Sequence, residues 1–171
     1  MTEEKKETKE KPEAVPLGET EAIDELTRPK IPENLPDETW PLEKLIEAAT
    51  KESNLLTRAN AVNVLANIGG AEVIETLILA LGDPEDPVKV NAMMGLSHLK
   101  KELVQDRMIE ALQEDEEGVR AGAAWVLGEM IDEKSMEPLQ KTADEDESVM
   151  VRVQAKASLL AYKKSKSETK E

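Results

Sequence analysis

Apolar residues recur along this chain at helical spacing, and the whole pattern repeats about every 31 residues. Each repeat begins at a basic residue, with alanine three residues later, leucine seven later and a larger apolar or aromatic residue ten later. The four bases are Arg58, Lys89, Arg120 and Arg152. Because steps of four and three residues return to the same side of a helix, the pattern predicts four similar amphipathic helices.

A second apolar pattern fills the other half of each repeat. Leucine or methionine stands nineteen residues after the base, and another apolar residue follows one turn later. The two sets are Leu77, Met108 and Leu139, and Leu81, Leu112 and Ala143. Leu45 extends this register upstream of the first complete repeat. The sequence thus predicts about eight helices: a lone second helix, three complete pairs and a lone first helix, with almost no strand.

Turn and capping residues mark the boundaries between these helices. Asp86 with Pro87, Ser53 and Ser148 are expected to begin first helices, "GDPEDP" separates two pairs, and "IGG" at Ile68 turns within one. The predicted units are a half repeat at 41–53, repeats at 54–86, 87–117 and 118–148, and a half repeat at 149–162. Together they form one repeat domain over residues 38–162.

The two ends of the chain differ in composition from the repeats. Residues 1–37 are rich in Lys, Glu and Pro and poor in large apolar residues, which predicts a disordered tail. Residues 163–171 are predicted to be a second, short polar tail. The whole chain has a formal net charge of −15, and residues 38–162 hold twice as many acidic as basic side chains. This charge argues against nucleic acid and anionic membranes as partners, while a locally basic patch stays open.

Cysteine is absent from the chain, which excludes disulfides, thiolate metal sites and cysteine catalysis. No apolar stretch approaches the roughly 20 residues that span a bilayer, and the first residues do not resemble a signal sequence. We therefore expect a soluble, cytoplasmic protein.

Residues 119–139, "VRAGAAWVLGEMIDEKSMEPL", resemble the short HEAT-like repeats of the phycobilin (PBS) lyase type. That pattern runs Val-Arg, alanines, often Trp, Leu-Gly, Ile-Gly-Asp and then a second helix. The resemblance covers roughly residues 40–162, and the second repeat departs from it with Lys100 and Lys101 in place of the glycine turn. It implies an all-α, right-handed α-α superhelix, a HEAT-like solenoid with the second helices on its concave face. Chromophore lyases, a metal-dependent hydroxylase and many adaptors share this scaffold, so it does not imply one function.

An enzymatic function finds little support in the residue types. Deoxyhypusine hydroxylase resembles this architecture but holds two irons with several His-Glu pairs, whereas the only histidine here is His98, expected on the surface. A chromophore groove needs aromatic walls, and Trp40, Trp125 and Tyr162 fall in different parts of the predicted fold. We assign no catalytic residue, metal or cofactor. An enzyme or enzyme subunit of the PBS-lyase-like family, a chromophore lyase or an oxidoreductase, is the alternative hypothesis.

Acidic residues recur on the second helices, two positions before the core residue, and again one turn later on two of them. The residues are Glu43, Glu75, Asp106 and Glu137, with Glu47 and Glu110 one turn further. One interpretation is an acidic concave strip that binds a basic peptide or protein surface with fast, salt-sensitive association. The other is that acids near helix N-termini complement the helix dipole, each by about 0.3–1 kcal/mol. The two interpretations are compatible.

The repeated bases also have two interpretations, a cationic site or a structural ladder that pairs with acids ending the preceding second helix. Asp83 precedes Lys89 by six residues, and Glu114 precedes Arg120 by six. The constant spacing favours a ladder that satisfies loop carbonyls and orients the repeats more than it adds net stability.

Trp125 stands five residues after its base, away from the Ala-Leu face. We expect it to pack over a neighbouring first helix, with a convex-surface contact as the other possibility. Met94 and Leu79 are expected to be partly exposed.

The sequence as a whole predicts a non-catalytic HEAT-repeat adaptor that binds another, basic protein or peptide through its acidic concave face. The lone helix at each end leaves open whether it is a monomer or a weak oligomer.

Overall fold

A computed structural model describes residues 31–168, and within them the chain forms eight α-helices, two short 3-10 helices and no strand. The α-helices are α1 (Leu42–Lys51), α2 (Leu55–Ile68), α3 (Ile74–Ala80), α4 (Asp86–His98), α5 (Lys101–Ala111), α6 (Glu117–Met130), α7 (Met136–Glu145) and α8 (Val149–Glu168). The 3-10 helices η1 (Ala71–Val73) and η2 (Glu133–Ser135) precede α3 and α7. The predicted all-α class and helix order are confirmed for these residues.

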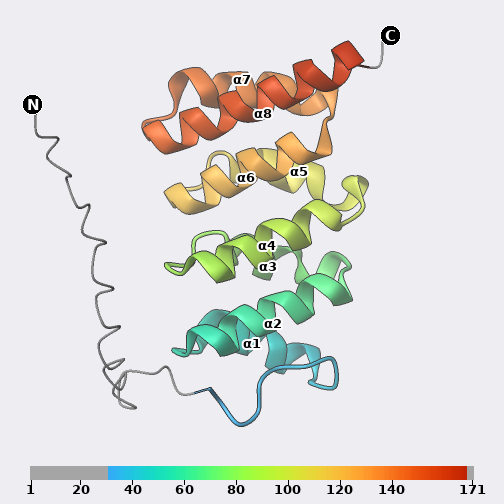
Figure 1. Cartoon of the computed structure of the whole chain (residues 1–171), viewed down its shortest axis with the longest axis vertical. Helices are drawn as coiled ribbons and strands as arrows, with labels where there is room; N and C mark the ends of the chain where they lie inside the picture. Colours follow the sequence, from blue (N-terminus) through green and yellow to red (C-terminus); the bar gives the residue numbers. More distant parts are fainter. Residues whose placement is uncertain (1–30, 169–171) are drawn as a thin grey trace, which may run out of the picture. The chain divides into compact units, whose positions relative to one another are not determined.

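The helices form two rows that follow the repeat. The first helices α2, α4, α6 and α8 lie one after another along the domain, and each contacts the next (Figure 1). The second helices α1, α3, α5 and α7 pack against α2, α4, α6 and α8 respectively. We call the surfaces of these two rows the first-helix face and the second-helix face.

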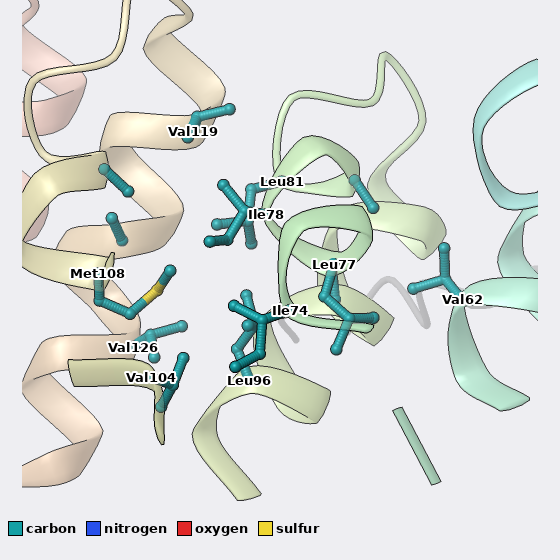
Figure 2. Packing of buried hydrophobic residues seen from close by; sticks show 14 of the residues in the cluster. Val62, Ile74, Leu77, Ile78, Leu81, Leu96, Val104, Met108, Val119 and Val126 are labelled. Atoms are coloured by element: carbon teal, nitrogen blue, oxygen red, sulfur yellow. The ribbon is translucent and has the colours of Figure 1, made fainter. Parts of the chain in front are cut away.

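The repeated alanine and leucine positions build the core, as their spacing predicts. All eight are buried: Ala61, Leu65, Ala92, Leu96, Ala123, Leu127, Ala155 and Leu159. Figure 2 shows how the other row contributes, with Ile78 of α3 and Leu81 directly after α3 directed toward Met108 of the second repeat and Val119 of the third. The position ten residues after the base is less buried than expected, since Ile68 is 49% exposed.

Small residues set the spacing between first helices. A Cβ atom on Gly95 of α4 would lie 2.4 Å from the Cβ of Ala66 on α2, and one on Gly128 of α6 would lie 2.4 Å from the Ser158 hydroxyl on α8. The Ser158 hydroxyl donates a hydrogen bond of 2.8 Å to the Ala124 carbonyl. Glycine at these two positions therefore allows a helix approach that alanine would obstruct.

The turns between paired helices differ from repeat to repeat. Gly69 and Gly70 both have positive φ, 66° and 89°, which agrees with the predicted "IGG" turn. In the third repeat Ile131 occupies the place of Gly69 and is left-handed, with φ of 47°. In the second repeat no glycine stands in the turn between the paired helices, and α5 begins directly at Lys101. This early start moves Asp106 out of the first turn of its helix.

Three capping predictions have different outcomes. Ser148 accepts from the backbone N–H groups of Met150 and Val151, as expected. The residue that caps α2 is Asn54 and not Ser53, because the Asn54 side chain accepts from Leu56 and Thr57. Asp86 is the first residue of α4 and makes no cap, since the cap position falls on Glu85.

Both predicted tails need correction where the structure describes them. Helix α8 continues to Glu168, so residues 163–168 are helical, supported by the Lys164–Glu168 pair of 3.9 Å one turn apart. A polar composition without Gly or Pro does not end a helix. Residues 31–37 have no helix or strand, yet Pro36 is buried. The disorder expected for residues 1–30 falls outside the described part of the chain, as do residues 169–171.

Candidate functional site

The repeated arginines join the loops between repeats. Arg120 Nη1 donates to the carbonyls of Glu114 and Asp115 at 3.0 and 2.8 Å, while its Nε and Nη2 donate to the Asp146 carboxylate at 2.9 and 3.2 Å. Both side chains are buried, at 8% and 7% exposure. Arg58 makes the same contacts, with the carbonyls of Glu52 and Ser53 and the carboxylate of Asp83. Each of these two arginines therefore joins the loop that precedes its own helix, through the carbonyls, to the loop that follows the second helix of its repeat, through the carboxylate.

The carboxylate partners differ from those expected. Arg120 uses the carbonyl of Glu114, the acid six residues before it, but its ionic partner is Asp146, which follows. Lys89 does not reach Asp83 and instead pairs with Asp86 at 2.9 Å within its own helix. Its shorter reach and single ammonium group cannot reproduce the fork of an arginine.

Arg152 forms only part of this arrangement. Its Nη1 donates to the carbonyls of Asp146 and Glu147 at 2.6 and 3.0 Å. No carboxylate pair is recorded for Arg152, because no described repeat follows α8 to supply the loop in which the acid would stand.

Hydrogen bonds keep the two carboxylates that pair with the repeated arginines, Asp83 and Asp146, in their charged form. Burial opposes the charged form of Asp83 and Asp146, yet hydrogen bonds from Arg58 and Arg120, and from the N–H groups of Glu85 and Ser148, hold each pKa below its usual value. Both carboxylates are therefore charged at neutral pH and hold their arginines in place.

The six acidic residues of the second helices are all exposed on the second-helix face. Two of them are engaged by a base of the next repeat. Arg107 donates to both carboxylate oxygens of Glu75 at 2.9 and 3.1 Å, and Lys134 pairs with Asp106. Since these contacts link successive repeats, Glu75 and Asp106 have a structural role beyond dipole complementation.

The other acids of this row remain open to solvent. Glu43, Glu110 and Glu137 form no hydrogen bond or ion pair within residues 31–168, and Glu47 makes only an exposed pair of 3.5 Å with Lys51. The Glu114 carboxylate does not pair with Arg120 as predicted, since it accepts from Arg107 at 2.9 Å, while the Glu114 carbonyl accepts from Arg120. Arg107, Lys134 and Lys51 thus each pair with one of the six acids, so the row is not the uninterrupted acidic strip that the sequence predicts.

A further cluster between the second and third repeats was missed by the sequence analysis. Lys101 donates to Asp132 at 2.6 Å, and Gln105 donates to both Asp132 and the buried Ser135, at 2.7 and 3.1 Å. The hydrogen bonds from Lys101, Gln105 and the backbone N–H of Lys134 lower the pKa of Asp132 to about 2. The spacing of 31 residues between Lys101 and Asp132 equals one repeat, and this was the signal available in the sequence.

The first-helix face carries a groove of about 590 Å³ over the N-terminal half of α6. Trp125 lines it and packs partly against the core, so its position over neighbouring first helices agrees with the expectation. Met94 and Leu79 are exposed, as expected, at 45% and 65%.

Chemically reactive groups are sparse in the described region. His98 is exposed on α4, as the sequence predicts. Between residues 31 and 168, no group of three or more His, Asp or Glu side chains is arranged to hold a metal ion. None of the helices in this range combines the length and apolar character required to cross a bilayer.

Comparison with known proteins places this geometry in a family. The family model for HEAT repeats matches residues 42–119 and 74–161. A HEAT repeat-containing taxis protein of Halobacterium salinarum is 29% identical over 121 residues, which cover 67% of this chain and 30% of the relative. The structure of human deoxyhypusine hydroxylase in complex with glycerol is similar with a TM-score of 0.58 and 28% identity, over 75% of this chain and 46% of that one. This chain therefore spans less than half the length of either protein. The matched repeats extend over α1 to α8, and the chain belongs to the HEAT-repeat family.

Proposed function

We propose that this protein is a non-catalytic scaffold whose second-helix face binds a basic segment of another protein. The observation that carries the proposal is the position of the open acids. Glu43 and Glu47 project from α1, Glu110 from α5 and Glu137 from α7, all exposed and on the same row of helices. Glu43, Glu110 and Glu137 have no internal partner, and Glu47 has only its exposed pair with Lys51, so these four acids are available to an oppositely charged ligand.

The ion pairs on the same face restrict where such a ligand binds. Glu75 and Asp106 are already matched by Arg107 and Lys134, so they lower the acidic potential in the middle of the row. The open acids form two groups, Glu43 and Glu47 on α1 and Glu110 and Glu137 on α5 and α7, with Glu110 one turn after Asp106 on the same helix. A partner whose basic residues fall into two groups fits this distribution better than a uniformly basic one.

The comparisons support a scaffold in two ways. HEAT-repeat domains stack helices into extended surfaces without requiring a catalytic centre. The relative from Halobacterium salinarum is named as a taxis protein, which favours a binding role in a signalling assembly for this chain. We also propose that the repeats are of the PBS-lyase type, on the strength of the stretch at 119–139.

Similarity to an enzyme supports a second hypothesis, that the protein is an enzyme or an enzyme subunit. The hydroxylase structure is 28% identical over 75% of this chain. Purified protein that contains stoichiometric iron, or that absorbs visible light through a bound chromophore, would establish this second hypothesis and overturn the scaffold proposal.

The scaffold proposal is tested by reversing the open acids. Glu110→Lys combined with Glu137→Lys removes two acids that have no internal partner, so the fold should be unaffected. Binding of a fluorescein-labelled twelve-residue Lys/Arg peptide, measured by anisotropy at 50 and 150 mM salt, should weaken about tenfold, because two local charges are inverted.

A matched variant controls for net charge. Glu38→Lys with Glu129→Lys changes the total charge equally at exposed residues that lie off the second-helix face. It should change the affinity by less than about threefold, since at 150 mM salt charges further than about 8 Å from the peptide are screened. Equal losses in both double variants would mean that the peptide responds to net charge alone, and the proposed face would be wrong.

A further inference from the structure

The groove on the first-helix face is formed by three successive first helices and by the loop between α3 and α4, Leu81 to Pro84. Val90 and Met93 of α4 line one side, Met150 and Gln154 of α8 the other, and α6 lies between them. The groove follows α6 from Glu116 to Trp125. It therefore combines residues of successive repeats and is absent from any single one.

The sequence of α6 explains why a hollow forms here. Val90 of α4 and Met150 of α8, which line the groove, correspond in the repeat to Ala121 and Gly118 of α6. Gly118 and Gly122 also let α6 approach the end of α3: a Cβ on Gly122 would lie 2.9 Å from the side chain of Leu81, and one on Gly118 would lie 2.9 Å from its carbonyl oxygen. Because α6 has small residues on this face and packs close to the end of α3, the larger side chains of α4 and α8 stand above it and form the two sides of the groove.

The lining of the groove is apolar and accessible. Val90 is 53% exposed and Met150 is 65% exposed, while Met93 and Trp125 are partly buried against the core. Methionine side chains adapt their shape to a partner, and tryptophan is enriched at the centres of protein interfaces. Groove volumes of this size are sufficient to receive one or two large side chains.

The charge around the apolar lining is negative. Asp86, Glu116 and Glu117 line the groove at the N-terminal ends of α4 and α6. Lys89 is the one basic side chain among the residues that line it, and Lys89 is neutralised by Asp86 at 2.9 Å. Glu117 accepts a hydrogen bond of 2.6 Å from the Ser148 hydroxyl, which fixes its carboxylate while leaving its charge unpaired.

We propose that this groove docks a protein segment in which a large apolar side chain is flanked by Lys or Arg. The apolar side chain enters between Met93, Trp125 and Met150, and the flanking bases face Glu116 and Glu117. The surface lies on the opposite row of helices from the acidic second-helix face, so the inference goes beyond the proposed function and does not depend on it.

A library of random twelve-residue peptides displayed on phage, selected against the purified full chain, tests this assignment. The selected peptides should carry Leu, Met, Phe or Trp next to Lys or Arg. In a Trp40→Tyr background, in which Trp125 is the remaining tryptophan, a synthetic copy of the selected peptide should shift the Trp125 emission to shorter wavelength.

Two pairs of substitutions locate the binding. Val90→Ser with Met150→Ser removes exposed apolar groups and should weaken the selected peptide at least about tenfold, as expected when interface anchors are truncated. Val153→Ser with Leu160→Ser removes comparable groups from α8 outside the groove, where they are 59% and 65% exposed, and should leave the affinity within about twofold. Glu110→Lys with Glu137→Lys should also leave this peptide's affinity unchanged.

Three results would overturn the assignment. The first is selection of peptides that lack an apolar residue beside a base, or no selection at all. The second is equal weakening by the two serine pairs. The third is self-association in sedimentation velocity that Val90→Ser with Met150→Ser abolishes, which would make a second copy of this chain the occupant.

Discussion

The buried pair of Arg120 and Asp146 should dominate the electrostatic contribution to stability in this domain. Arg120→Met keeps an unbranched apolar stem but removes five hydrogen bonds: two to the carbonyls of Glu114 and Asp115, two to Asp146, and a longer one of 3.4 Å to the exposed Glu147. It leaves the Asp146 carboxylate, 7% exposed, without its cation. Breaking a buried pair in this way costs about 3 kcal/mol.

Arg152→Met provides the matched comparison. Arg152 makes the same two carbonyl contacts but has no carboxylate partner in the described repeats, so its loss should cost about 1 kcal/mol. The difference of about 2 kcal/mol isolates the ionic pair from the carbonyl clamp. Urea unfolding followed by circular dichroism at 222 nm measures both, provided that the dependence on urea is the same in each variant.

The outcome also depends on the state of Asp146. Adding Asp146→Asn to Arg120→Met removes the unpaired charge and keeps an acceptor for the Ser148 N–H, so the double variant should recover part of the lost stability. A cost for Arg120→Met no greater than for Arg152→Met would refute the reasoning, because it would mean that desolvation of the two charges cancels their attraction.

Three further predictions concern the other junctions. Lys89→Arg should raise the free energy of unfolding by about 1 kcal/mol in the same urea assay, because a guanidinium can reach the carbonyls of the preceding loop as Arg58 does; no change would show that this junction cannot accept the fork. Ile131→Gly should raise the melting temperature, since it relieves roughly 1–2 kcal/mol of left-handed backbone strain and gives back part of it as chain entropy; a lower melting temperature would show that the packing of Ile131 outweighs the strain. The folded pKa of Asp132, about 2, lies below its unfolded value of about 3.9, so its contribution is complete above pH 4 and is lost as the pH falls toward 2. Asp132→Asn should therefore flatten the decline of stability measured between pH 4 and 2, and an unchanged slope would contradict the cluster.

Sequence periodicity was sufficient for the helices and their core because both depend on local spacing. Each repeat places Ala and Leu at the same distance from its base, and a helix turns such spacing into one buried face whatever lies further along the chain. The same repetition located the acidic row and the bases. The repeat pattern ends at Tyr162, so it could not show that α8 continues through the polar residues that follow. The polar composition of those residues predicts a tail, but it does not by itself end a helix.

The partners of these charged residues were decided by the tertiary structure. Arg120 had acids on both sides in the sequence, and the stacking of α7 and α8 brought Asp146 to its guanidinium while Arg107 engaged Glu114. The groove beside Trp125 likewise exists only where α4, α6 and α8 meet. Residues 25 to 32 positions apart become neighbours when one repeat stacks on the next, and the choice among several acids within reach depends on loop geometry that a one-dimensional pattern does not contain.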